Sequence, residues 1–255
     1  MAITPPEKPE DIFADLAEDY IKALGSDLLS LVLFGSAASG RYQKGRSDLN
    51  LLAVVSNPAG RVLSRLAPVV TKWAPARVSA PLVMTSQYLA SSLDVFPVEF
   101  LTMAASHQVI HGQDPLEGLE IKPRHLRLQL EREFKGKLMT LQSRFLMAGG
   151  QAPALEALAL AALPAFTALF QAYLQLTKGA FPRDPAQVWS QVAESGLEVS
   201  AFLTLENLRQ GSLKLEPADL ARTLEQAAAQ LAEVCRVVDK LEVAEQAKPT
   251  QSMLH

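Results

Sequence analysis

Residues 31–55, LVLFGSAASGRYQKGRSDLNLLAVV, are the stretch that decides the fold. An apolar run ends in Gly35-Ser36, a polar loop follows, and Asp48 and Asn50 open a second apolar run. Both runs have the length and composition of buried strands. A glycine lets the backbone approach a phosphate closely, and a serine hydroxyl can donate a hydrogen bond to it. Asp48 and Asn50 lie two residues apart, so on a strand they point to the same face, and the pattern predicts one polar site.

These residues resemble the motif of nucleotidyltransferases of the DNA polymerase β kind, which include minimal nucleotidyltransferase domains. In that motif an apolar residue precedes Gly and then Gly or Ser, and after a loop come acid, apolar, acid and apolar residues. The matching positions are Phe34, Gly35, Ser36, Asp48, Leu49 and Leu51. Asn50 stands where the family has its second acid. The resemblance implies an α+β domain with a small mixed β-sheet and flanking helices, which binds a nucleoside triphosphate together with magnesium.

A third carboxylate on a later strand completes the family's site or acts as its base, while the first two acids hold magnesium ions on the triphosphate. Glu99, in the segment FPVEFL, is the best-placed match, because strand alternation would turn its apolar neighbours inward and Glu99 toward the site. Asp94 is a weaker match because it precedes the expected strand. The resemblance thus implies Asp48, Asn50 and Glu99 as metal ligands, with Glu99 also as the catalytic base.

The loop between the two strands carries cations that can meet a triphosphate, and Lys44 and Arg46 are the expected contacts. They join Gly35 and Ser36 as candidate nucleotide-binding residues. Other interpretations stay open for each feature. A charged loop is commonly just solvated, Gly35-Ser36 also fits an ordinary turn at a strand end, and Glu99 also fits a solvated position on an edge strand.

Hydrophobic periodicity predicts the elements around this motif. A helix at residues 10–24 should end at Gly25, and Pro68 should kink or shorten a helix at residues 58–73. The other expected elements are strands at 29–34, 48–55, 77–84, 95–103 and 109–110, and a short helix that Thr85 caps and that runs to about residue 93.

After residue 115 the strand patterns disappear, and every long segment has helical periodicity. A first helix begins near Pro123 and ends at Gly149-Gly150, with the pairs Glu131 to Lys135 and Glu133 to Lys137 on its exposed side. Further helices are expected at 154–178, 185–195 and 219–241, and four or five helices would pack as a bundle. The expected domains are a nucleotidyltransferase-like domain at 1–118, a helical bundle at 119–246 and a disordered tail at 247–255. This order resembles antibiotic nucleotidyltransferases in architecture.

The composition of the chain indicates which classes of binding partner to expect. The formal net charge of −3 over 255 residues gives no extended surface for nucleic acid, so a small substrate is expected. One cysteine excludes an internal disulfide. The N-terminus lacks the features of a signal peptide and no stretch approaches the ~20 apolar residues of a membrane span, so a cytoplasmic protein without a membrane partner is expected. A homodimer stays open.

Two functions of different classes follow from the pattern. The first is an enzyme that moves a nucleoside monophosphate from a magnesium-bound triphosphate to a hydroxyl of a small molecule or a protein. The second is a catalytically impaired protein of the same fold that binds a nucleotide or a partner. Asn50 separates them, because a neutral amide oxygen is a weaker ligand for a dication than a carboxylate, so the magnesium site should be weakened or lost.

Overall fold

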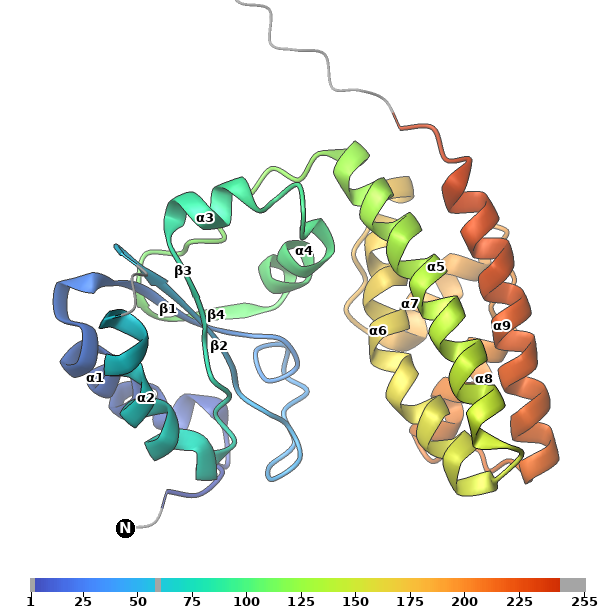
Figure 1. Ribbon diagram of the computed structural model, residues 1–255, viewed down its shortest axis with the longest axis horizontal. Coiled ribbons are helices and arrows are strands. Elements are labelled where there is room, and N and C mark those ends of the chain that lie inside the picture. The colour runs from blue at the N-terminus through green and yellow to red at the C-terminus, as the bar shows by residue number, and fades with distance from the viewer. Residues whose placement is uncertain (1–2, 58–60, 244–255) are drawn as a thin grey trace, which may run out of the picture. The chain divides into compact units, whose positions relative to one another are not determined.

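The computed structural model describes residues 3–57 and 61–243. The predicted tail at 247–255 lies outside the described residues. The chain divides into two compact units, Met1–Glu120 and Ile121–His255. The first unit contains the sheet, and the second is helical (Figure 1).

The sheet of the first unit has the order β3-β2-β1-β4. Its strands are β1 (Leu28–Phe34), β2 (Asn50–Val55), β3 (Leu82–Met84) and β4 (His107–Gly112). Strand β1 runs antiparallel to β2 and β4, whereas β2 and β3 are parallel. The mixed sheet predicted from the sequence is therefore confirmed, and the two strands of the motif are direct neighbours at its centre.

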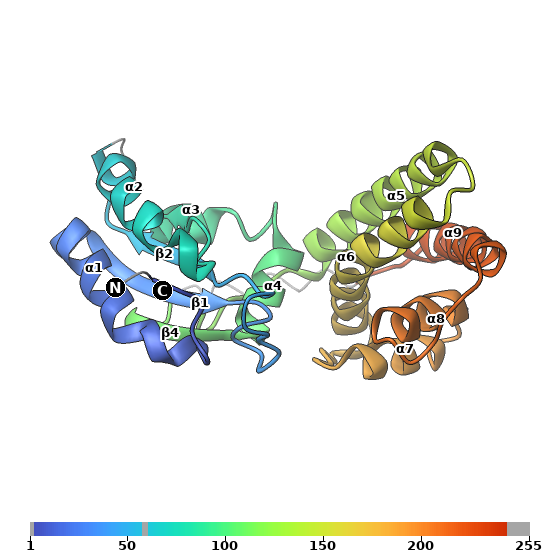
Figure 2. The same cartoon turned by 90° about the horizontal axis from the view of Figure 1, so that it is seen from below.

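Helices α1 (Phe13–Leu24) and α2 (Arg61–Trp73) pack on one face of the sheet (Figures 1 and 2). Their apolar stripes share a buried cluster with Leu49 and Leu51. Because side chains alternate along a strand, Asn50 points to the opposite face. Helices α1 and α2 therefore do not cover the face of the sheet that carries Asn50.

Asp19 of α1 ties the two covering helices together. Its Oδ2 accepts hydrogen bonds from the Lys72 ammonium at 2.5 Å and from the indole N–H of Trp73 at 2.8 Å. Burial raises the pKa of Asp19, but the hydrogen bonds from Lys72 and Trp73 and the charge of Lys72 lower that pKa more, so it lies below its ordinary value of 3.8. The ionised carboxylate therefore stabilises the contact between α1 and α2.

Asp19→Ala is expected to lower the free energy of unfolding by about 1–3 kcal/mol at neutral pH, because it leaves the buried indole N–H of Trp73 without an acceptor. A depressed folded pKa gives stability that is present above the unfolded pKa and lost as the pH falls through the folded one. The difference between wild type and variant should therefore shrink below pH 3.8. Urea denaturation followed by fluorescence measures this, and a difference that stays constant with pH would contradict it.

Several predicted elements of the first unit are confirmed and one is wrong, and the strand predicted at 77–84 is shorter, with β3 at Leu82–Met84 and an isolated bridge at Val78. Gly25 ends α1 at a positive φ of 57°, and the Thr85 hydroxyl caps α3 (Ser86–Ser91) by accepting from the Tyr88 N–H. Helix α2 continues through Pro68 to its end at Trp73. The strand predicted at 95–103 is instead a helix, α4 (Pro97–Ala105). Proline with its fixed φ suits a first helical position, and so short an apolar run fits either period.

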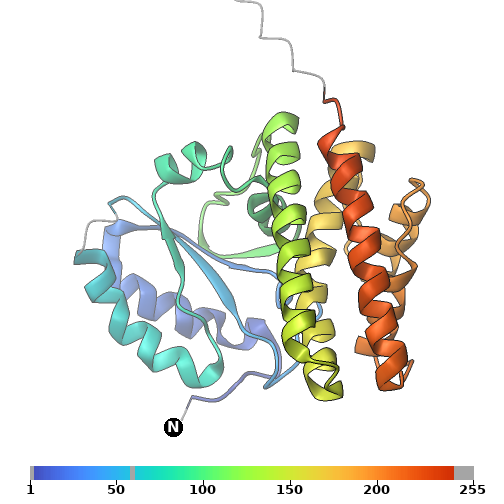
Figure 3. The same ribbon diagram turned by 45° about the vertical axis from the view of Figure 1, so that its right-hand side comes forward.

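The second unit is a bundle of long and short helices (Figure 3). They are α5 (Pro123–Ala148), α6 (Ala152–Lys178), α7 (Pro185–Ala193), α8 (Ser200–Arg209) and α9 (Pro217–Asp239). Gly149 ends α5 in the left-handed conformation, as predicted. The core holds rings whose centroids lie 5.1–5.6 Å from their neighbours: Phe134, Phe166, Phe170, Trp189 and Phe202.

Helix α6 is the centre of this bundle. By length and composition it is apolar enough to cross a membrane, with a mean hydropathy of 1.7 over its most apolar window, which the sequence prediction had not recognised. However, 61% of that window is buried inside the protein. A core helix packed on all sides has this composition too, and burial against α5, α7, α8 and α9 accounts for it.

Candidate functional site

The end of β1 forms a turn with open hydrogen-bond donors. Gly35 has a φ of 84°, and its N–H donates to the Ser106 carbonyl at 3.0 Å. Its carbonyl accepts from the N–H groups of Ala38 and Ser39, each at 3.1 Å. Within residues 3–57 and 61–243, neither the N–H nor the hydroxyl of Ser36 meets an acceptor. A turn after a positive-φ glycine with an open N–H and hydroxyl is suited to hold an anion.

The carboxylate of Asp48 forms an ion pair with Arg77. The bridge between Leu49 and Val78 sets Asp48 beside Arg77, and Arg77 Nη2 lies 2.7 Å from Asp48 Oδ1. The same nitrogen donates to the carbonyl of Arg46 at 3.1 Å. The side chains of Asp48 and Arg77 are 56% and 40% exposed, so solvent and a ligand can reach the pair.

Arg77 is held in an uncommon backbone conformation. Its φ is 61° and its ψ is 27°, which makes it the one non-glycine residue with a positive φ among those that the structure describes. Left-handed backbone costs an ordinary L-residue roughly 1–2 kcal/mol. Strain of this kind gathers at functional sites, so Arg77 is a candidate that the motif did not reveal.

Asn50 is bound by a neighbouring hydroxyl. Ser79 Oγ donates to Asn50 Oδ1 at 3.2 Å, across the same parallel register. The amide nitrogen faces the turn, because a Cβ built on Gly35 would lie 3.5 Å from Asn50 Nδ2. Asn50 pairs with Phe34 across the two strands, so the amide lies directly under the turn. Asn50 therefore links the turn to the segment that leads into β3.

This donor set does not fit a two-metal centre. Such a centre needs carboxylates that bridge and flank two dications. Here the strand ends supply the carboxylate of Asp48, already paired with Arg77, and the amide of Asn50. Among the described residues there is also no group of three or more His, Cys, Asp or Glu side chains that could hold a metal.

Glu99 lies on a different element from the one predicted. It is an exposed residue in the first turn of α4, so the strand alternation that pointed it at the site does not apply. The opposite end of α4 adjoins the turn, since Ser106 accepts from Gly35. Seven residues of helix span ~10 Å, which separates Glu99 from that end. Its role as base or third ligand stays a prediction.

The predicted loop cations lie on the exposed rim of the turn. Lys44 Nζ forms an ion pair with the Glu7 carboxylate, and both side chains are at least half exposed. Arg46 is exposed, and its carbonyl accepts from Arg77. Their contact with a triphosphate stays a prediction. Arg77 and Ser79, which the sequence reasoning missed, share a signal with the motif: two polar residues, two apart, open the strand predicted at 77–84.

His107 lies on β4, beside the end of β1 where the turn begins. It pairs with Phe34 between β1 and β4, its Nε2 lies 2.8 Å from Asp114 Oδ2, and its Nδ1 lies 3.0 Å from the Ala104 carbonyl. Burial raises the pKa of Asp114, but hydrogen bonds from His107 and from the Leu116 N–H lower that pKa more, so it lies below its usual range. Both ring nitrogens are occupied, which favours a structural role for His107.

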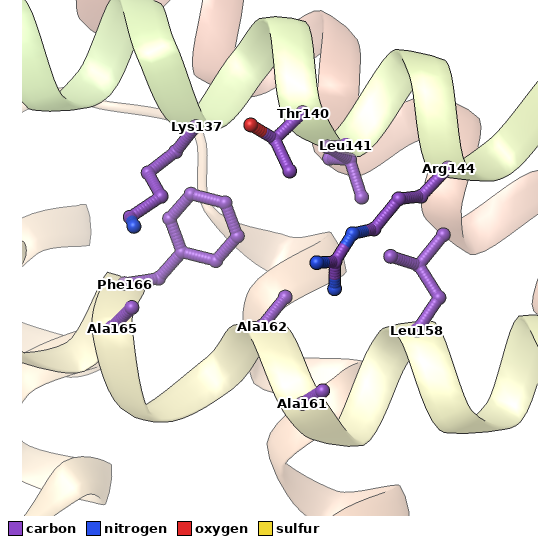
Figure 4. Close-up of a pocket in the computed structure, with 9 residues that line it drawn as sticks. All are labelled: Lys137, Thr140, Leu141, Arg144, Leu158, Ala161, Ala162, Ala165 and Phe166. Carbon is purple, nitrogen blue, oxygen red and sulfur yellow. The ribbon is translucent and has the colours of Figure 1, made fainter.

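A separate pocket of about 130 Å³ lies between α5 and α6 of the helical unit (Figure 4). Lys137 and Arg144 extend from α5 toward α6, over a floor that includes Ala162 and Phe166. No acidic residue lines it, so its charge would favour an anion. The predicted pair Glu131–Lys135 is confirmed at 2.6 Å, and it is found within α5 outside this pocket.

A comparison with solved structures finds spectinomycin adenyltransferase AAD(9) from Enterococcus faecialis, in a crystal structure with ATP and spectinomycin. The match has a TM-score of 0.55 at 14% sequence identity, and covers 89% of this chain and 100% of that chain. This chain has a nucleotidyltransferase-like fold. The predicted architecture, an α+β half followed by helices as in an antibiotic nucleotidyltransferase, is therefore confirmed. No protein-family model matches the chain, and neither does any curated protein.

Proposed function

We propose that this chain binds a nucleoside triphosphate at the Gly35–Ser36 turn without assembling a two-metal centre, and that it acts as a nucleotide-responsive binding protein. The ion pair between Asp48 and Arg77 carries the proposal, because a guanidinium occupies the carboxylate on which a metal would depend. The open N–H and hydroxyl of Ser36 are the groups that would hold a phosphate.

The charges of the site support anion binding without metal. In an active centre of this kind the carboxylates are negative, and dications must bridge them to an anionic triphosphate. In this chain the charge of Asp48 is offset by Arg77, that of Lys44 by Glu7, Asn50 is neutral, and the exposed Arg46 adds positive charge. The turn therefore has no net negative charge that a metal must neutralise before a phosphate can bind.

Calorimetric titration with ATP in chelator and in magnesium tests the proposal. We expect binding in chelator, with an affinity within about threefold of that in magnesium, since the protein supplies its own cation. GTP, CTP and UTP in the same series report which base is preferred. Binding that requires magnesium, or release of pyrophosphate on adding magnesium and a hydroxyl acceptor, would overturn it.

A second candidate function is transfer of a nucleoside monophosphate to a hydroxyl of a small molecule or a protein. The observation in its favour is the extent of the match to the spectinomycin adenyltransferase, which spans 89% of this chain and includes its helical half. In this candidate Asp48 would leave Arg77 to bind magnesium, and Glu99 would act as base or third ligand. Loss of magnesium-dependent pyrophosphate release in Glu99→Gln would support it.

Asn50→Asp is expected to lower the melting temperature by a few degrees in chelator, on the order of 2–4 °C for 1 kcal/mol in a chain of this size. The new carboxylate would face Asp48 on the same side of the strand, with one guanidinium shared between them. On adding magnesium and ATP, the melting temperature of the variant should rise more than that of wild type, because the added charge restores a dication ligand.

One series of thermal-shift measurements tests both the lower melting temperature of Asn50→Asp in chelator and its larger rise with magnesium and ATP. Asn207→Asp makes the same chemical change on α8 of the other unit, which does not contribute to the turn, and should show the wild-type response to magnesium. An Asn50→Asp variant that responds to magnesium no more than Asn207→Asp would show that position 50 is not beside a metal-binding position.

A further inference from the structure

Some hydrogen-bond donors of the Arg77 side chain have no acceptor among the described residues. An arginine has five N–H donors, and the two contacts of this side chain, to Asp48 and to the Arg46 carbonyl, both use Nη2. Within residues 3–57 and 61–243, Nε and Nη1 meet no acceptor. Three donors of a planar fork thus stay available on a side chain that is 40% exposed, and such a fork can bind two oxygens of a phosphate.

The start of β2 links Arg77 to the Gly35–Ser36 turn. Phe34 pairs with Asn50, and a Cβ built on Gly35 would lie 3.5 Å from Asn50 Nδ2, so the start of the turn lies beside Asn50. Asp48 lies two residues before Asn50 and points to the same face. Arg77 lies on Asp48. The turn that carries Ser36 and the guanidinium of Arg77 therefore lie beside neighbouring residues, Asn50 and Asp48, at the start of β2.

The backbone of Arg77 adds an independent observation. Glycine or asparagine is the usual residue in left-handed conformation, yet an arginine is held there. The N–H of Arg77 donates to the Ala74 carbonyl and its carbonyl accepts from Leu49, so the strained residue is fixed on both sides. This rigid placement aims a long cationic side chain along the start of β2, at the carboxylate of Asp48.

We propose that Arg77 is the resident cation of this site, and that it binds a phosphate group of the nucleotide in the role that a metal ion has in two-metal nucleotidyltransferases. The proposal rests on the proposed function, since it names the group that makes metal-free binding work. Asp48 positions the guanidinium through one nitrogen and leaves the other two for the ligand. No bond is broken or formed in this step.

Arg77→Gly is the most informative variant, because glycine adopts the left-handed conformation without strain, so the fold should be kept. We expect its affinity for ATP in chelator to fall by about tenfold or more, which is the range for a lost charge-assisted phosphate contact. Inorganic triphosphate should show the same loss, since the contact is to phosphate and not to the base. Arg77→Asn, also suited to this backbone, should repeat the result, and Arg77→Lys should keep part of the affinity.

Magnesium provides the second readout. Removing Arg77 frees the carboxylate of Asp48, so magnesium should now tighten ATP binding to Arg77→Gly, although it has little effect on wild type. If wild type binds in chelator and Arg77→Gly binds equally well, the role of Arg77 is overturned while the proposed function stands. If wild type does not bind ATP in chelator, both are overturned. Thermal unfolding of each variant shows that any lost binding comes from a folded protein.

Discussion

Gly35→Val is expected to lower the affinity for ATP by at least about a hundredfold, or ~3 kcal/mol. Gly35 has a φ of 84°, a conformation that a β-branched residue rarely adopts, so the turn would have to change shape. The added side chain would also grow toward Asn50, whose Nδ2 is 3.5 Å from the position of the new Cβ. Both effects displace the N–H and hydroxyl of Ser36 that are to hold the phosphate.

Gly40→Val is the matched control for this experiment. Gly40 lies in the same loop at a φ of 75°, but a Cβ there meets no atom within 4 Å. The two variants therefore share the backbone strain and differ in whether the new side chain grows toward Asn50. Calorimetry should find a clearly smaller loss of affinity for Gly40→Val than for Gly35→Val. Lys44→Ala should weaken binding only a few-fold, because Lys44 is exposed and paired with Glu7. Equal affinities for both glycine variants would show that the motif no longer binds nucleotide.

The sequence predicted the centre of the first unit well because its signals are local. An apolar run, a glycine and a polar pair lie within 25 consecutive residues, and strands that follow each other in the chain commonly pair, as β1 and β2 do. The partners of that pair were not predictable in the same way. Arg77 and Ser79 reach Asp48 and Asn50 through a parallel pairing, and such pairings follow a long crossover connection whose register the sequence does not state.

The wrong strand at 95–103 has a different cause. The buried residues of α4 include Pro97, Phe100 and Met103, whose spacing of three fits a helix, while Val98 and Phe100 alternate as in a strand. Over so few residues the two periods cannot be separated. This error moved Glu99 from a strand edge to an exposed helical turn, and with it the argument for a third metal ligand.

The helical unit was predictable where helices are long and have strong ends. Gly149 ends α5 and Lys178 is followed by Gly179, which ends α6, both in the left-handed conformation. Helix α8 was missed, because its N-cap, Val199, makes no side-chain capping bond and its stripe is short. Its burial depends on Phe202, which stacks on Trp189 at 5.4 Å, a contact that only the packed bundle defines.

Gly112→Ala is expected to destabilise the first unit by more than about 3 kcal/mol, the range of a core clash. Gly112 ends β4 at a φ of 79°, opposite Ser30 of β1. An added Cβ would lie 2.0 Å from the carbonyl oxygen of Leu29, and because that atom belongs to the backbone of the central strand, the clash cannot be relieved by a side-chain rotation. The backbone of β1 or β4 must shift, at the cost of their hydrogen bonds.

Gly118→Ala separates this clash from strain in the backbone alone. Gly118 has a φ of 68° and no atom within 4 Å of the position of a Cβ, so its substitution should cost only about 1–2 kcal/mol. The chain has two tryptophans, of which Trp73 lies in the first unit, so in a Trp189→Phe background the tryptophan fluorescence comes from Trp73 and reports on that unit. Urea denaturation in this background should show a much lower midpoint for Gly112→Ala than for Gly118→Ala. Equal midpoints would mean that β1 and β4 are not held together at Gly112, and the pairing that places His107 behind the turn would then have to be revised.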